Sequence, residues 1–298
     1  MKILVWDIPT RLFHWLFAGA FAVAWLTSEE DAWLNVHVFV GYLMLGLLGF
    51  RLMWGFAGGR YARFASFRFS WKEGIAYLLQ VLTGSAKRHI GHNPAGSWAV
   101  YLLLALGLLA GLSGMITLAG QEGQGPLAPW VPYSAGEAFK EVHEALASAM
   151  LGAVVLHLAG VALESWRHRE NLPRAMLTGL KEGTPDAATP SRRLLSALIL
   201  LVAIGAGGVW FFGNAPITAR EHDASYKINR SIDPRETPLR ISETPYWQGK
   251  HQQIAENVWH NPQIGTRANC TACHKDAERG VFVGATIPRD VVTRVAMR

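Results

Sequence analysis

The sequence predicts an all-α membrane protein, with a four-helix transmembrane bundle, a fifth transmembrane helix and a small C-terminal domain of short helices and irregular structure. Half of the 298 residues are hydrophobic and only 17% are charged, whereas soluble domains average about 25% charged residues. Five apolar stretches each approach the ~20 residues that a helix needs to cross a bilayer. After the last stretch, the chain becomes polar.

The five predicted spans are separated by loops that differ in charge. The spans cover residues 8–27, 35–56, 98–119, 141–163 and 194–212. Lys and Arg gather at the N-terminus, in the loop 57–94 and after the fourth span, while the other two loops contain few. Because positive loops stay inside, we expect a multi-pass protein of the bacterial cytoplasmic (inner) membrane, with a cytoplasmic N-terminus and a periplasmic C-terminal domain. The net charge of +6 therefore indicates contact with the lipid bilayer and no nucleic acid.

The loop between the second and third spans has two local signals. Residues 64–82 mix aromatic, aliphatic and cationic side chains, which is typical of a helix that lies along a membrane surface. Asn93 can cap the third span, and Pro94 suits the first position of a helix.

The polar C-terminal region contains the only two cysteines, in the motif Cys270-Thr271-Ala272-Cys273-His274. Cys-x-x-Cys-His is the attachment motif of c-type haem, in which both thiols bond to the porphyrin and the histidine ligates the iron. The alternative is a zinc site that recruits His260 beside the thiols and His274. His260 and His251 are the favoured sixth ligands of a haem c, with His222, Met297 or an open position as further alternatives.

Four histidines in the predicted spans indicate two further metal centres. His143 and His157 are 14 residues apart in the fourth span, so they share a helix face at depths about 21 Å apart. The predicted topology places His14 at the inner depth of His157, and His37 at the outer depth of His143. Since a low-spin b-type haem needs two axial ligands, we expect His14–His157 to hold an inner haem b and His37–His143 an outer one. The alternative is four histidines hydrogen-bonded to neighbouring helices.

Further residues are candidates for cofactor contacts. Arg11, Arg51 and His92 are candidate neighbours of a haem propionate or of a quinone. The arginines have the alternative role of cytoplasmic anchors, and His92 that of an interfacial polar residue. Glycines in the second, third and fourth spans leave space for a flat macrocycle or for a closely packed helix.

Residues 1–175 contain the motifs VWDIPTRLFHW, VHVFVGY, FRLMWG, IGHNPAG, VHE and VLHLAGV. Together these motifs resemble the prokaryotic cytochrome b561 family, which includes the cytochrome b subunits of nickel–iron hydrogenases. The resemblance implies a four-helix di-haem b core, ligated by His14, His37, His143 and His157, that exchanges electrons with the quinone pool. The region NPQIGTRANCTACHKDAERG is similar to part of small periplasmic dihaem cytochromes c, with one attachment motif in place of two.

These observations predict three parts. Residues 1–180 form the di-haem membrane domain, residues 181–213 a linker and the fifth span, and residues 214–298 a periplasmic cytochrome c-like domain. The predicted function is electron transfer between a periplasmic redox protein and the quinone pool, through two haem b and one haem c. The alternatives are a superoxide:quinone oxidoreductase, a cytochrome b anchor of a periplasmic oxidoreductase, and a non-redox zinc module. No catalytic residue is assigned, which leaves open whether the chain is an electron-transfer protein or a quinone-linked oxidoreductase.

Overall fold

A computed structural model describes residues 1–28, 33–189, 193–214, 228, 231–232, 237–252, 254–274 and 277. The chain divides into two compact units. The first unit comprises Met1–Gly114 and Lys140–Asn214, and the second comprises Met115–Phe139 and Ala215–Arg298. The helices α4 and α5 described below therefore contribute to both units.

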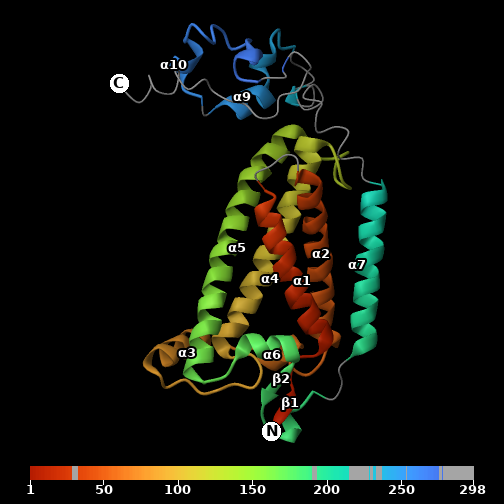
Figure 1. Ribbon diagram of the computed structural model, residues 1–298, viewed down its shortest axis with the longest axis vertical. Helices are drawn as coiled ribbons and strands as arrows, with labels where there is room; N and C mark the ends of the chain where they lie inside the picture. The colour runs from red at the N-terminus through yellow and green to blue at the C-terminus, as the bar shows by residue number, and fades with distance from the viewer. Residues whose placement is uncertain are drawn as a thin grey trace. The chain divides into compact units, whose positions relative to one another are not determined.

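Five long helices match the five apolar stretches of the sequence (Figure 1). They are α1 (Ile8–Leu26), α2 (Leu34–Ala57), α4 (Pro94–Thr117), α5 (Tyr133–Arg167) and α7 (Leu194–Asn214). Among the described residues, four helices are long and apolar enough to cross a membrane: Leu34–Ala57, Pro94–Glu122, Tyr133–Arg167 and Leu194–Phe211. The fold class, an all-α membrane protein, is thereby confirmed.

The helix α1 is not among these four candidates. It has 19 residues, and Pro9, Arg11 and His14 occupy its first two turns. These residues lower its apolar content, so the membrane crossing of α1 stays a prediction. Asp7 caps its start, and the cap at the start of α4 is the predicted one, since Asn93 Oδ1 accepts a 2.6 Å hydrogen bond from Gly96 N.

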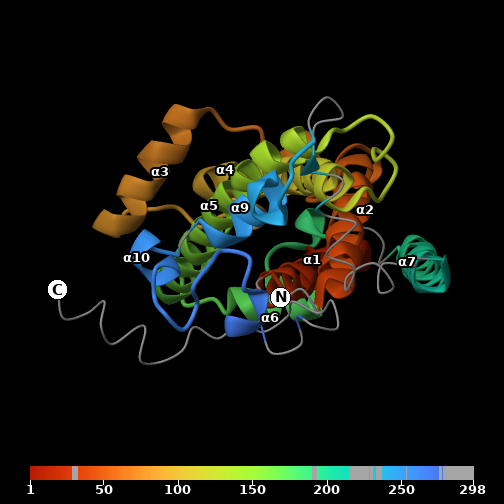
Figure 2. The ribbon, with the colours of Figure 1, turned by 90° about the horizontal axis from the view of Figure 1, so that it is seen from above.

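The first unit packs around α1 and α2, which lie side by side, with α7 against both (Figures 1 and 2). One buried cluster joins Ala20, Val40, Met44 and Met150 of α1, α2 and α5. A second cluster joins Phe13, Leu47 and Leu200, which holds α7 to the bundle. The apolar side chains of the spans thus meet in small clusters between the helices.

Short elements cover the end of the bundle where α1 and α4 begin, which we call the N-terminal end (Figure 1). They are α3 (Trp71–Thr83), α6 (Leu172–Thr178), the strands β1 (Lys2–Leu4) and β2 (Leu180–Glu182), and 3₁₀ turns at Phe64–Phe67 and Pro185–Ala187. The strands pair antiparallel with Ile3 opposite Lys181, which ties the N-terminus to the chain after α5. The helix α3 leaves Ile75, Leu79 and Leu82 exposed on one face, as expected for a helix that lies along a membrane surface.

The second unit consists of short elements, as the sequence predicts. A π-helical turn (Leu118–Glu122) follows α4. The C-terminal region contains α9 (Pro245–His251), α10 (Glu256–Trp259) and 3₁₀ turns at Ile241–Glu243 and Cys270–Ala272. Val258 and Ile264 form a small core, against which Ala272 and Cys273 pack. The attachment motif therefore lies against the apolar centre of this region.

The carboxylate of Asp7 joins the start of α1 to the end of α2, and its removal should destabilise the protein. The side chain is buried and accepts hydrogen bonds from Thr10 N (3.0 Å), Trp54 Nε1 (3.3 Å) and Gly59 N (3.3 Å). Asp7→Ala leaves these donors unpaired, which should cost about 2–3 kcal/mol and lower the melting temperature in detergent. Asp186→Ala, at an exposed position, is the matched control. Equal melting temperatures for both variants would contradict this role.

Candidate functional site

One pair of facing imidazoles lies at the end of the bundle where α1 ends and α2 begins. The ring centroids of His37 (α2) and His143 (α5) are 6.1 Å apart, with an angle of 84° between the ring planes. Each Nδ1 lies 2.9 Å from a backbone carbonyl oxygen of a neighbouring helix, Ala24 for His37 and Ala110 for His143. A carbonyl can only accept, so Nδ1 carries the proton and the lone pair is left on Nε2. This is the tautomer that a metal-ligating histidine adopts.

A second pair lies toward the N-terminal end. The ring centroids of His14 (α1) and His157 (α5) are 6.4 Å apart, with 55° between the planes. Trp15 lies edge-on to His14, with the centroids 5.0 Å apart. The structure thus brings together both of the histidine pairs that the sequence predicts, at two depths along α5.

The dimensions of both pairs fit a bis-imidazole haem. A metal–imidazole bond of about 2 Å on each side of one iron places the two ring centroids about 6 Å apart. The observed separations of 6.1 and 6.4 Å agree with this arrangement. His14 Nδ1 is buried and has no hydrogen-bond partner among the described residues, so its ring needs a metal or another polar partner.

The glycines of the spans fall into two groups. A Cβ on Gly41, one turn after His37, or on Gly160, three residues after His157, would meet no atom within 4 Å. This open space suits a flat macrocycle beside each ligand. The α4 glycines serve close helix packing instead, because a Cβ on Gly111 would lie 2.5 Å from a Leu45 methyl and one on Gly114 would lie 3.0 Å from the His143 ring.

The predicted arginines differ in their surroundings. Arg11 Nη1 donates to the Leu177 carbonyl of α6, which fits an anchor for that segment. Arg51 is 3% exposed and lies over the Phe64 ring, with its Cζ 4.8 Å from the centroid. Its Nη1 is buried without a hydrogen-bond partner among the described residues. A buried, incompletely bonded guanidinium fits an anionic partner such as a propionate.

His92 lies among aromatic rings at the N-terminal end, packed against Phe67 (centroids 4.4 Å apart) and Trp6 (4.8 Å). Burial lowers the pKa of His92 to about 3, and the nearby charge of Arg51 adds to this effect. The imidazole is therefore neutral at physiological pH and can act as a hydrogen-bonding neighbour of a bound group.

A third imidazole pair lies in the C-terminal region. The ring centroids of His251 and His274 are 6.2 Å apart, with 77° between the planes. His251 Nδ1 lies 2.7 Å from the Trp247 carbonyl oxygen, so its lone pair is on Nε2, as in His37 and His143. Cys270 and Cys273 flank the 3₁₀ turn that precedes His274, and both are half-buried. Two thiols and a pair of facing imidazoles fit an attached haem c.

The other candidate sixth ligands are placed less favourably. His260 is exposed at the end of α10, where its Nδ1 lies 2.9 Å from the carbonyl oxygen of Glu256 in the same helix. His222 and Met297 lie outside the described residues. Among the residues that the structure describes, no three His, Cys, Asp or Glu side chains are arranged to hold a metal ion, which gives the zinc alternative no support.

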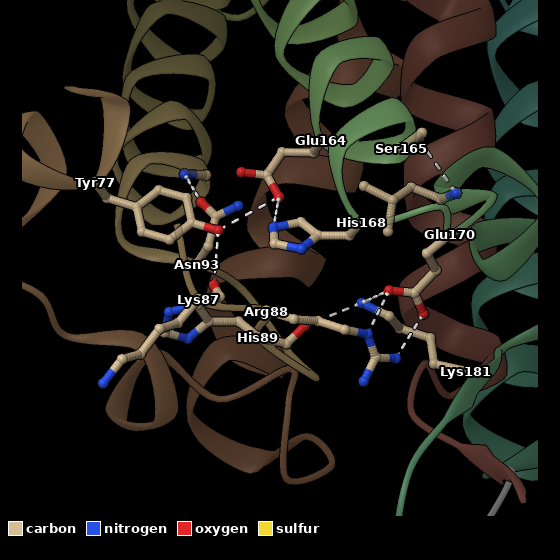
Figure 3. Close-up of polar contacts among 12 residues, drawn as sticks. Tyr77, Lys87, Arg88, His89, Asn93, Glu164, Ser165, His168, Glu170 and Lys181 are labelled. Carbon is tan, nitrogen blue, oxygen red and sulfur yellow. Dashed lines mark hydrogen bonds and ion pairs between the residues drawn. The ribbon is translucent and has the colours of Figure 1, made fainter. Parts of the chain in front are cut away.

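A small, partly open polar pocket lies at the N-terminal end, where α5 ends and β2 passes the start of α4 (Figure 3). It is lined by Arg88, His89, Gly91, Asn93, Glu164, His168, Glu170, Leu172 and Lys181. Glu170 accepts hydrogen bonds from the Arg88 guanidinium (2.9 and 3.1 Å) and lies 3.4 Å from Lys181 Nζ. Glu164 Oε2 lies 3.2 Å from His168 Nε2 and accepts a 3.3 Å hydrogen bond from the Tyr77 hydroxyl.

Burial shifts the pKa of three groups at this polar pocket. It lowers the pKa of the His89 imidazole and of the Lys181 ammonium, in Lys181 against the opposing effect of Glu170. It raises the pKa of the Tyr77 hydroxyl, and the charge of Glu164 raises it further. Tyr77 therefore stays protonated and acts as a donor to Glu164.

Sequence reasoning did not find Glu164, His168, Tyr77, Glu170 or Lys181. A usable signal is present, because Glu164 and His168 are four residues apart at the end of an apolar helix, where they share a face. The partners of this pair come from α3 and β2, and no sequence spacing relates them to α5.

Comparisons with known proteins match two families to separate parts of the chain. Residues 5–179 match the family described as prokaryotic cytochrome b561, and residues 216–282 match the family described as dihaem cytochrome c. With only two cysteines, the chain contains a single attachment motif.

The curated relatives are hydrogenase cytochromes. A probable Ni/Fe-hydrogenase B-type cytochrome subunit of Azotobacter chroococcum is 28% identical over 223 residues, which cover 62% of this chain and 91% of that protein. A probable Ni/Fe-hydrogenase 1 B-type cytochrome subunit of Escherichia coli is 30% identical over 33% of this chain and 52% of its own length. No solved structure matches the chain.

The b561 match covers the whole bundle with its two histidine pairs, and the cytochrome c match covers the region with the attachment motif. The chain therefore belongs to the prokaryotic cytochrome b561 family, as a membrane b-type cytochrome that carries a c-type haem domain.

Proposed function

We propose that the protein conducts electrons between a periplasmic redox protein and the quinone pool, through two haem b and one haem c. The observation that carries this proposal is the set of three facing imidazole pairs, two along α5 and one beside the attachment motif. Each haem, when bound, supplies an iron that changes its charge by one electron. The proposed site is the bacterial inner membrane, with the N-terminus in the cytoplasm and the haem c domain in the periplasm.

In the membrane, the chain's role is ligation and orientation. His14 with His157 would hold the inner haem b, and His37 with His143 the outer one. The carbonyls of Ala24 and Ala110 fix the ring orientation and tautomer of the outer pair, and hydrogen bonds of this kind also raise the basicity of a ligand. Arg51 already has the Asp7 carboxylate near its charge, and it would offer a propionate of the inner haem its buried Nη1, which has no hydrogen-bond partner among the described residues.

In the C-terminal domain, Cys270 and Cys273 would bond to the porphyrin, and His274 and His251 would ligate its iron. The contact between His251 and His274 favours His251 over the exposed His260. The helix α7 begins beside Trp54 at the N-terminal end and reaches Phe39 at the other, where the rings of Phe39 and Phe211 are 5.4 Å apart. The chain thus leaves the bundle at the end that carries the outer pair, which supports electron exchange between haem c and the outer haem b.

For the quinone, we propose the polar pocket. Glu164 follows His157 by seven residues, so the two side chains share a face of α5 and lie about 10 Å apart along the axis. Quinone carbonyl oxygens accept hydrogen bonds, and Arg88, His89 and Lys181 bring donors to the pocket. His92 is near enough to Arg51 and to Lys181 for both charges to lower its pKa, so it is a further candidate neighbour of either bound group.

A second candidate function follows from the names of the relatives. The curated relatives are cytochrome subunits of Ni/Fe-hydrogenases, and a related role here is a membrane anchor for a periplasmic oxidoreductase. In that case the C-terminal domain would receive electrons from a bound enzyme rather than from a diffusing carrier. A stable complex that purifies with the full chain would favour this second role.

The proposal predicts about two b haems and one c haem per chain, measured by the pyridine haemochrome method. A quinol analogue added to the purified full chain should reduce haem b and haem c together. Cys273→Ala, which prevents normal attachment, should preserve reduction of haem b while abolishing electron transfer to a periplasmic acceptor. A spectrum without b-type haem, or a protein that quinol leaves oxidised, would refute the conduit.

The pairing of the histidines predicts selective haem loss. His157→Ala removes a ligand of the inner haem only, so haem b should fall from about two to about one per chain, and the remaining signal should be that of the outer pair. His143→Ala should remove the other signal. The control is His89→Ala, which replaces a histidine that has no facing imidazole in the structure. Loss of both b haems in each ligand variant, with the chain still folded, would contradict the pairing.

The position of His251 predicts its effect on haem c. His251→Ala should convert a six-coordinate, low-spin c haem into a form that binds carbon monoxide, because the position opposite His274 opens. His260→Ala is the matched control and should leave the visible and electron paramagnetic resonance spectra unchanged. The reverse result would assign the sixth position to His260.

A further inference from the structure

The polar pocket contains two acidic groups in different electrostatic settings. Glu170 lies between two fixed cations, the Arg88 guanidinium and the Lys181 ammonium, as Figure 3 shows. Glu164 instead contacts a neutral hydroxyl, that of Tyr77, and an imidazole, that of His168. Glu170 is thus paired with two cationic groups, whereas Glu164 is paired with an imidazole and a hydroxyl, both of which can donate a hydrogen bond.

Glu164 and His168 lie within reach of each other. Glu164 Oε2 and His168 Nε2 are 3.2 Å apart, an ion-pair contact whose present orientation is not that of a hydrogen bond. Both side chains line the pocket and remain partly exposed, 14% for Glu164 and 15% for His168. A turn of the imidazole that aligns the two atoms would let a proton pass between them. Imidazole is the side chain that ordinarily changes its protonation near neutral pH.

We infer that Glu164 and His168 are a proton-transferring pair for a quinone in the polar pocket. This inference rests on the proposed function, in which the pocket binds quinone. Reduction of the quinone takes up two electrons and two protons, and an O–H bond forms at each carbonyl oxygen. The electrons come one at a time from the haem chain. Each proton comes from the Glu164 carboxyl or the His168 imidazolium, which then regains a proton from water.

The surrounding groups tune this pair from several elements. The titratable groups nearest to the Glu164–His168 pair are Tyr77 of α3, His89 of the loop before α4 and Lys181 of β2. Glu170 and Arg88 also line the pocket. The Tyr77 hydroxyl donates to Glu164 and so orients the carboxyl group. When the quinol is oxidised instead, the same two groups accept the protons.

The test compares two electron acceptors for the full chain with its haems reduced. Ubiquinone-1 or a menaquinone analogue takes up protons on reduction, whereas ferricyanide takes up none. Glu164→Gln should slow quinone reduction at least about tenfold, since a positioned proton donor is worth about 10²–10⁴ in rate. The rate with ferricyanide should stay unchanged.

Three variants and two further measurements separate this role from a structural one. Glu164→Asp retains a proton donor and should recover most of the quinone rate, and Glu182→Gln, at an exposed position on β2, should resemble the wild type. His168→Asn should slow quinone reduction as Glu164→Gln does. Haem spectra should be the same in every variant. The carboxyl stretching band that appears on redox cycling in infrared difference spectra should vanish in Glu164→Gln.

The outcomes distinguish this inference from the proposed function. If the wild type reduces quinone and Glu164→Gln does so equally fast at every pH, the proton-transferring pair is refuted while the conduit stands. If Glu164→Gln slows quinone and ferricyanide equally, the residue supports the fold or the haem, and the inference is again refuted. If the wild type reduces ferricyanide but no quinone, the proposed function fails, and the pair fails with it.

Discussion

The bundle depends on the hydrogen bonds between imidazole nitrogens and backbone carbonyls of neighbouring helices. The Ala24 carbonyl lies in the last turn of α1, where a carbonyl has no intrahelical N–H partner, and the Ala110 carbonyl lies inside α4. A carbonyl that accepts from a side chain of another helix fixes the distance between the two helices. The carbonyl of Ala24 does this for His37, and that of Ala110 does it for His143. Two contacts of 2.9 Å thus define how α1, α2, α4 and α5 lie around the outer pair.

These contacts matter because the imidazoles lie in apolar surroundings. A polar nitrogen in an apolar surrounding is costly unless it is bonded, and each imidazole has two nitrogens to satisfy. A carbonyl satisfies Nδ1 of His37 and of His143, and Nε2 is left for a metal. His14 Nδ1 has no hydrogen-bond partner among the described residues. The orientation of the His14–His157 pair therefore depends more on the group that binds between the two rings. The outer site is therefore built largely by the protein and the inner site less completely.

Much of the fold and of the candidate site could be predicted from the sequence, for identifiable reasons. Apolar length determined the spans, and α7 begins at Leu194 as expected. The charge of the loops predicted the direction in which each span crosses the membrane. The direction of the spans predicted the depth of each histidine, and matching depths paired His14 with His157. The helix α5 begins at Tyr133, eight residues before the predicted start at residue 141. Its first turns are polar, so a prediction based on the length of the apolar stretch does not include them.

Other parts could not be predicted, because they depend on contacts between distant segments. The choice between His251 and His260 depends on how two short helices fold around His274, and neither helix has a periodic pattern. The polar pocket combines the end of α5, the start of α6, β2 and the loop before α4, so its members are scattered from Arg88 to Lys181. The different surroundings of Arg11 and Arg51 could not be predicted from the sequence either, because both are single cations near the ends of apolar helices.

The small sheet has a consequence for the order of assembly. The strand β1 precedes the helices of the bundle in the chain, and its partner β2 follows only after α5. Ile3 is paired with Lys181, and Lys181 lines the polar pocket. The pocket can therefore close only after all four helices of the bundle have been made. Until that moment the N-terminal strand has no partner, and any extension added to the N-terminus would be held beside the pocket in the finished protein.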